Sequence, residues 1–120
     1  MTRPINHYDI AVIGAGIVGS SLACALADVG FKVVLVAAQA LDCTNDWPTD
    51  QFDPRVSALS AASRHLLQHL GAWSEIAVQR LQPYRFMHVW DSCGTQVIDF
   101  QAAELHRNEL GFIIENRCIT

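Results

Sequence analysis

The chain has 120 residues, enough for one domain at most, and its 51% hydrophobic and 17% charged residues exclude intrinsic disorder. Its formal net charge of −4, without any run of basic residues, argues against nucleic acid as a partner. The four cysteines have spacings that fit neither a CxxC pair nor a zinc site, so we interpret them as reduced thiols: Cys24, Cys43, Cys93 and Cys118.

We expect no secretory signal, because residues 1–8 lack a charged start followed by an uninterrupted apolar stretch. Residues 10–27 contain no charged side chain and therefore imitate a membrane span. Three glycines within six residues, and a first half rich in β-branched residues, favour a strand, a turn and a helix there instead.

A βαβ unit is expected at the start of the chain. Residues 8–13 predict a buried strand, and apolar residues at helical spacing predict a helix over residues 17–29 that ends at Gly30. Residues 32–37 predict a second strand, which must be parallel to the first because a helix separates the two.

Residues 38–55 are rich in Asp, Asn and Pro and predict a long loop, a feature that is often functional. Ser60 is placed to cap a helix that continues through Leu70 and stops at Gly71. Ser74 is placed to cap a shorter helix over residues 75–81.

The last third of the chain predicts β-structure. Alternating residues over 84–90, a turn at 92–95 and a strand over 96–100 are typical of an antiparallel hairpin, and residues 110–115 predict a further strand. Asn116 could start a helix after it.

The motif Gly14-x-Gly16-x-x-Gly19 joins the first predicted strand to the first helix. Gly14 permits a tight turn, Gly16 lets backbone approach a pyrophosphate, and Gly19 lets the helix pack closely on the strand. The N–H groups at the helix N-terminus then favour an anion. We therefore assign nucleotide binding to the whole turn, residues Gly14, Ala15, Gly16, Ile17, Val18 and Gly19.

Ala37 stands where this motif normally has an acidic residue that binds the ribose hydroxyls. Losing a charge-assisted hydrogen bond of about 1.5–3 kcal/mol weakens binding roughly ten- to hundredfold. No Arg or Lys follows at residues 38–40, so a switch to a ribose 2′-phosphate is not supported. Gln39 and Asp42 are the alternative ribose contacts.

A second set of motifs begins with Asp53-x-Arg55-x-Ser57-Ala58-Leu59-Ser60 and continues with Leu66-Leu67, Leu70-Gly71-Ala72-Trp73, Pro83-Tyr84, Val89-Trp90-Asp91 and Leu110 to Asn116. This combination closely resembles the ubiquinone-biosynthesis FAD-dependent hydroxylases of the UbiH, UbiF and VisC type. They are class A flavoprotein monooxygenases, similar to p-hydroxybenzoate hydroxylase. The resemblance extends over essentially all of the chain from Tyr8 onward.

The resemblance implies an α/β fold: a Rossmann-like βαβ FAD-binding unit followed by the start of an antiparallel substrate-domain sheet. Residues 1–82 would be the N-terminal part of the FAD-binding domain, and residues 83–120 the beginning of the substrate-binding sheet. The glycine turn would hold the FAD pyrophosphate, and Arg55 matches the family arginine near the pyrophosphate and ribityl chain. A guanidinium fork suits phosphate oxygens.

The resemblance also implies NAD(P)H as co-substrate and a polyprenylated phenol or quinol as the ring that is hydroxylated. We expect a cytoplasmic location, peripheral to the inner membrane or within a biosynthetic complex. The family's later motifs are absent, so we expect an N-terminal segment that is inactive alone, self-associates and contains no catalytic residue that can be named.

Two alternatives remain open. The chain could be a truncated, non-catalytic remnant that binds nucleotide weakly or acts through protein contacts, which Ala37 favours. A nicotinamide-dependent dehydrogenase would share the βαβ unit but leaves the Asp53-x-Arg55 motif unexplained. His65 and His69, four residues apart, are interpreted as surface histidines rather than metal ligands. For His88 and three aromatic residues we expect core packing rather than a cofactor stack: Trp73, Phe86 and Trp90.

Overall fold

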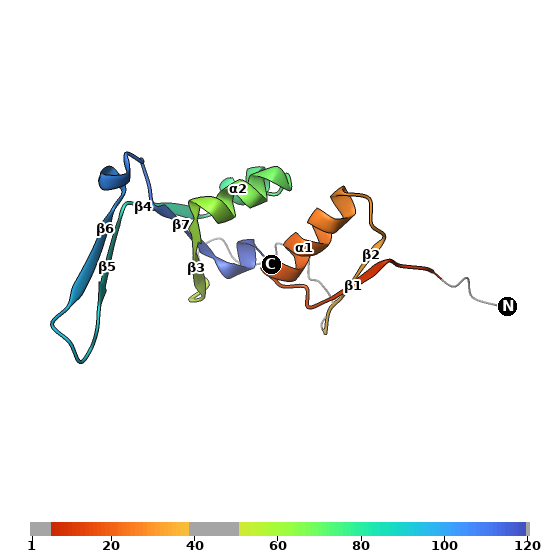
Figure 1. The fold of residues 1–120 in the computed structure, drawn as a ribbon, viewed down its shortest axis with the longest axis horizontal. Helices are drawn as coiled ribbons and strands as arrows, with labels where there is room; N and C mark the ends of the chain where they lie inside the picture. The colour runs from red at the N-terminus through yellow and green to blue at the C-terminus, as the bar shows by residue number, and fades with distance from the viewer. Residues whose placement is uncertain (1–5, 39–50, 120) are drawn as a thin grey trace. The chain divides into compact units, whose positions relative to one another are not determined.

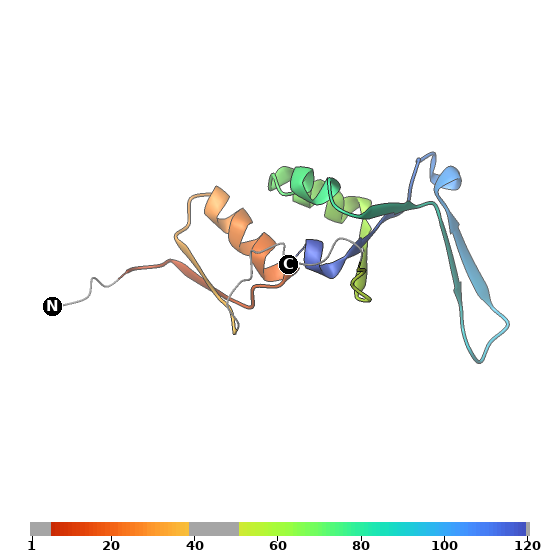
Figure 2. The same ribbon diagram turned by 180° about the vertical axis from the view of Figure 1, so that it is seen from behind.

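The computed structural model describes residues 6–38 and 51–119, which divide into two compact units between Gln51 and Phe52 (Figures 1 and 2). Each unit contains both helix and strand, so the predicted α/β class is confirmed. No helix within the described ranges is long and apolar enough to cross a membrane. The proposed division at residues 82 and 83 into cofactor and substrate regions remains a prediction.

The first unit is the expected βαβ arrangement of β1 (Ile10–Ile13), α1 (Ile17–Asp28) and β2 (Val33–Val36) (Figure 1). The two strands are parallel and pair in register from Ile10 with Val33 to Ile13 with Val36. Gly30 ends the helix as predicted: its φ is +98°, and its N–H donates to the Ala27 carbonyl at 2.9 Å. The predicted strand, turn, helix and strand are therefore confirmed.

The second unit contains an antiparallel sheet in which β7 (Gly111–Glu115) lies between β3 (Val56–Ser60) and β4 (Leu81–Tyr84). Helices α2 (Ala61–His69) and α3 (Trp73–Ala77) follow β3 and precede β4 in the sequence. Ser60 caps α2 as predicted, because its Oγ accepts the Ser63 N–H at 3.2 Å. Most of the buried apolar side chains of this unit come from the sheet and both helices, and one comes from the 3-10 turn Ala102–Leu105: Leu59, Leu67, Ile76, Phe112, Ile114 and Ala102.

The prediction of a helix over residues 75–81 is wrong. Helix α3 starts at Trp73 and ends at Ala77, and Leu81 already belongs to β4. The Ser74 hydroxyl lies 3.4 Å from the Gly71 carbonyl, to which it donates, and it does not cap a helix. Strand β4 contains Pro83, which is tolerated because β4 pairs on one side only within the described sheet.

The predicted hairpin is confirmed: β5 (Phe86–Trp90) and β6 (Val97–Gln101) are antiparallel, and their side chains are all exposed. Short 3-10 turns η1 (Ala102–Leu105) and η2 (Asn116–Cys118) follow β6 and β7. The expectation of core packing was wrong for Phe86 and Trp90, which are 53% and 66% exposed. Only two hairpin strands pair there, so neither face of the hairpin is covered within the described residues.

His88 on β5 was expected to be packed, but it is exposed. Its ring stacks against Phe86, with centroids 6.3 Å apart, and lies 5.3 Å from the Trp90 ring. Its Nδ1 bonds the carboxylate of Asp99, its cross-strand partner. Trp73, in contrast, packs edge-on against Phe112 at 5.3 Å, in agreement with its expected role.

Candidate cofactor-binding site

The glycine turn is built on the carboxyl ends of β1 and β2. Gly14 has a φ of +103°, which favours glycine strongly, and its N–H donates to the Val36 carbonyl at 2.8 Å. This bond closes the turn directly onto the last residue of β2. The predicted role of Gly14 in a tight turn is thus confirmed.

Helix α1 begins with unusually little capping. Gly16 is its N-cap, no side chain bonds its first N–H groups, and no acidic residue lies in its first turn. An ideal Cβ at Gly16 would meet no heavy atom of the first unit within 4 Å, so space is open beside these groups. Neither the N-cap nor the first turn of α1 therefore supplies a group that neutralises the partial positive charge of the helix N-terminus.

The absence of a side chain at Gly19 allows α1 to pack closely against the turn. An ideal Cβ at this position would lie 1.9 Å from the Gly14 carbonyl oxygen and 3.6 Å from Cγ1 of Val12. The Ser20 hydroxyl also donates to the Ala15 carbonyl at 3.1 Å, which ties the turn to the helix. Among the intervening residues, Ile17 is half-buried and Val18 is 78% exposed. The motif thus has the shape of a pyrophosphate cradle.

Ala37 directly follows β2, beside the turn that Gly14 closes onto Val36. Its methyl group is exposed and cannot accept a hydrogen bond from a ribose hydroxyl. Gln39 and Asp42, the alternative contacts, lie outside the described residues. The glycine turn of the motif is therefore present, whereas the expected ribose acceptor is missing at residue 37.

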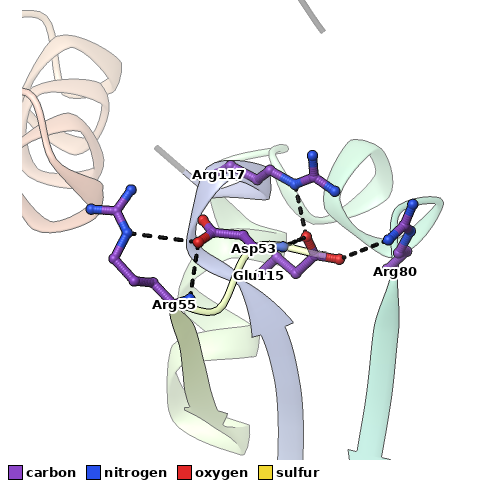
Figure 3. Close-up of polar contacts among 5 residues, drawn as sticks. All are labelled: Asp53, Arg55, Arg80, Glu115 and Arg117. Carbon is purple, nitrogen blue, oxygen red and sulfur yellow. Dashed lines mark hydrogen bonds and ion pairs between the residues drawn. The ribbon is translucent and has the colours of Figure 1, made fainter. Parts of the chain in front are cut away.

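Arg55 belongs to the second unit, just before β3, and its side chain is 80% exposed (Figure 3). Its N–H donates to Oδ1 of Asp53 at 2.9 Å, and its Nε lies 3.7 Å from the same oxygen. The bonds to Asp53 hold the stem of Arg55, while its guanidinium fork faces solvent. An exposed, anchored fork is suited to phosphate oxygens.

The backbone of Asp53 is hydrogen-bonded to Glu115 at the end of β7, a contact that was not predicted from the sequence. The Asp53 N–H donates to Oε2 of Glu115 at 2.8 Å, and the two residues are only 7% and 4% exposed (Figure 3). The other contacts of Glu115 come from Arg117 at 2.8 Å and Arg80 at 3.5 Å. The sequence indicates the importance of both residues only in that Asp53 and Glu115 lie within the motifs that carry the family resemblance.

The pKa of Glu115 is lowered from its ordinary value. The largest cause is the hydrogen bond from the Asp53 backbone; burial opposes it, and Arg117 and Arg80 reinforce it. The pKa of the nearby Cys118 thiol is raised, chiefly by burial. Glu115 is thus an ionised carboxylate at neutral pH.

The other residues singled out in the sequence are two histidines and the cysteines. His65 and His69 are both exposed, as predicted. No group of three His, Cys, Asp or Glu side chains suited to a metal occurs in the two described ranges. The described cysteines, Cys24, Cys93 and Cys118, are unpaired with one another; Cys43 lies outside the described residues.

Comparison with known proteins identifies the nucleotide. The sequence profile of a family described as FAD dependent oxidoreductase matches residues 9–110. The chain belongs to this family. The match includes both the glycine turn and Arg55, and it favours FAD over a nicotinamide as the nucleotide.

The relatives have names from ubiquinone biosynthesis. The chain is 40% identical over 109 residues to 3-demethoxyubiquinol 3-hydroxylase of Escherichia coli, covering 90% of this chain and 27% of that protein. It is 36% identical over 115 residues to the mitochondrial ubiquinone biosynthesis monooxygenases of Xenopus tropicalis and Homo sapiens, covering 93% of this chain and 24% of each. The resemblance inferred from the motifs is confirmed, and the chain spans about a quarter of these relatives' length.

Proposed function

We propose that this chain is the FAD-binding part of an NAD(P)H- and FAD-dependent aromatic-ring monooxygenase. The observation that carries the proposal is the uncapped N-terminus of α1 behind the Gly14 turn. Open space at Gly16 and close packing at Gly19 are what a pyrophosphate requires of this turn. The relatives' names supply the reaction class.

In this proposal the chain's residues bind and orient the cofactor. The N–H groups of Ile17, Val18 and Gly19 donate hydrogen bonds to the pyrophosphate oxygens. Arg55, in the second unit, contributes a guanidinium fork to binding of the cofactor, as the family resemblance implies. Bound FAD supplies the redox chemistry that activates dioxygen. Ala15 contributes backbone only, and Ala37 contributes no polar group to the ribose.

The proposed substrate is a polyprenylated phenol or quinol of ubiquinone biosynthesis. This proposal rests on the relatives, two of which are named as ubiquinone biosynthesis monooxygenases and one as a hydroxylase of a ubiquinol. Electron-rich rings of this class are what FAD-dependent hydroxylases of the family are expected to modify, with NAD(P)H as reductant. A lipid-like substrate favours a protein that works at a membrane surface or in a biosynthetic complex.

A second candidate is a non-catalytic interaction module descended from the same family. Ala37 favours it, because the missing carboxylate lowers the expected affinity for the nucleotide. The apolar side chains exposed on the hairpin favour it as well, since such surfaces often mark protein contacts. This candidate predicts partner binding that is independent of FAD.

Titration of the purified chain with FAD, followed by visible absorption and flavin fluorescence, distinguishes the two candidates. The FAD-binding proposal predicts saturable spectral shifts that weaken in an Arg55→Ala variant. Arg107→Ala is the charge-matched control, since Arg107 is also exposed in the second unit. A chain that ignores millimolar FAD, or an Arg107→Ala variant as weak as Arg55→Ala, contradicts the proposed role.

A further inference from the structure

The turn that carries Arg55 is held from a distant part of the chain. Glu115 lies at the end of the central strand β7, and 62 positions separate it from Asp53. Its Oε2 accepts the buried Asp53 N–H at 2.8 Å. Glu115 also pairs with Val56 across β3 and β7, so its backbone and its carboxylate both lie beside the turn that carries Arg55.

The next links lead from Asp53 to Arg55. Oδ1 of Asp53 accepts the Arg55 N–H at 2.9 Å and lies 3.7 Å from Arg55 Nε (Figure 3). On the other side, the Asn116 N–H donates to the Arg55 carbonyl at 3.0 Å. The backbone N–H, the carbonyl and Nε of Arg55 are thus used in these contacts. The two terminal nitrogens of its guanidinium group take part in none of them.

The charge of Glu115 is balanced by Arg117 in η2 and by Arg80 in the loop before β4. Arg117 in η2 contacts Oε2 at 2.8 Å, and Arg80 contacts Oε1 at 3.5 Å. Their side chains are 22% and 31% exposed, against 80% for Arg55. A buried carboxylate with this many donors has little freedom to move, so it is a rigid anchor for the turn.

We propose that Glu115 is a positioning residue for Arg55: through Asp53 it fixes the direction of the Arg55 fork and thereby sets the affinity of the chain for FAD. The inference rests on the proposed function, in which Arg55 contributes to FAD binding. The alternative is that Glu115 merely stabilises the end of β7. The two alternatives make different predictions. If Glu115 only stabilises the end of β7, its removal should lower the affinity for FAD by the same factor whether or not Arg55 is present.

Two measurements on the purified chain test the inference. Backbone amide hydrogen exchange, without any FAD, reports on the turn itself. Glu115→Gln keeps an acceptor oxygen and Glu115→Ala removes it, so exchange at Asp53 and Arg55 should accelerate slightly in the first variant and strongly in the second. Glu109→Gln is the matched control, because Glu109 is paired with Arg64 at 3.2 Å, elsewhere in the same unit.

FAD titration then tests the consequence. Glu115→Ala should weaken FAD binding roughly tenfold, to about the level of Arg55→Ala, and the double variant should be no weaker than Arg55→Ala alone. If Glu115→Ala does not fold, Asp53→Ala removes the carboxylate that contacts Arg55. The Asp53→Ala, Arg55→Ala double variant should then bind FAD no more weakly than Arg55→Ala alone.

Each result supports or overturns the inference. Additive losses of affinity, or unchanged exchange at Asp53 and Arg55 in Glu115→Ala, overturn it and leave Glu115 as a structural residue. Wild-type protein that fails to bind FAD refutes the proposed function. Accelerated exchange in that case still shows that Glu115 positions Arg55, but overturns its link to FAD affinity.

Discussion

The carbonyl oxygen of Gly14 occupies the space that a side chain at Gly19 would need, with only 1.9 Å between that oxygen and an ideal Cβ. The Gly14 backbone cannot move aside without a large cost in free energy, because its N–H is hydrogen-bonded to the Val36 carbonyl. We expect Gly19→Ala to lower the free energy of unfolding by about 1–3 kcal/mol and to abolish FAD binding. Thermal unfolding with FAD titration measures both, and a variant as stable as the wild type would contradict the geometry.

Gly16 provides the contrasting prediction. It has a φ of −73°, which alanine adopts freely, and no heavy atom within 4 Å of an ideal Cβ. Gly16→Ala should therefore change stability by no more than about 0.5 kcal/mol while removing FAD binding, because the methyl group fills space kept for the pyrophosphate. A Gly16→Ala chain that still binds FAD with wild-type affinity would show that the open space does not serve the ligand.

The glycine turn could be predicted because all of its determinants lie within a few residues of one another. Gly14, Gly16 and Gly19 each serve a local backbone requirement, and the strands on either side are short apolar runs. The parallel pairing then followed from chain connectivity alone. The backbone geometry of the glycine turn could thus be predicted from the sequence.

Strands β3 and β4 escaped prediction because their pairing depends on β7, which follows them far along the chain. Val56–Ser60 alternates weakly and runs directly into a helix cap, and β4 contains Pro83. Glu115 was missed for the same reason: nothing local indicates that its carboxylate accepts the Asp53 N–H. Contacts between distant positions need the folded sheet to bring them together.

Restoring the missing carboxylate should strengthen FAD binding. Ala37→Glu places an acceptor after β2, where the motif normally binds the ribose hydroxyls. A gain of about 1.5–3 kcal/mol corresponds to roughly ten- to hundredfold tighter binding. Isothermal titration calorimetry with FAD measures it, and Ala37→Gln separates hydrogen bonding from charge. Unchanged affinity in Ala37→Glu would mean that another residue already binds the ribose.

Acid should destabilise the second unit through Glu115. The pKa of this carboxylate is lower in the folded chain, first because of the Asp53 N–H and then because of Arg117 and Arg80. Its stabilising contribution is therefore present above the unfolded pKa of about 4.3 and is lost as pH falls through the folded value. Glu115→Gln should flatten this loss in chemical denaturation below about pH 4.5, whereas Glu109→Gln should retain it. Equal acid sensitivity in Glu115→Gln and the wild type would assign the loss to other groups.

One face of the hairpin should make the isolated chain self-associate. Strand pairing brings together the four apolar side chains Met87, Phe100, Val89 and Ile98. They are 37% to 58% exposed, and a two-stranded hairpin is marginally stable by itself, so burial against a second copy stabilises it. Ile98→Lys should shift the chain toward monomer in size-exclusion chromatography with light scattering. Gln68→Lys introduces the same charge on the exposed side of α2, outside the hairpin, and should leave association unchanged. If both variants dissolve the oligomer equally, net charge rather than this apolar face governs association.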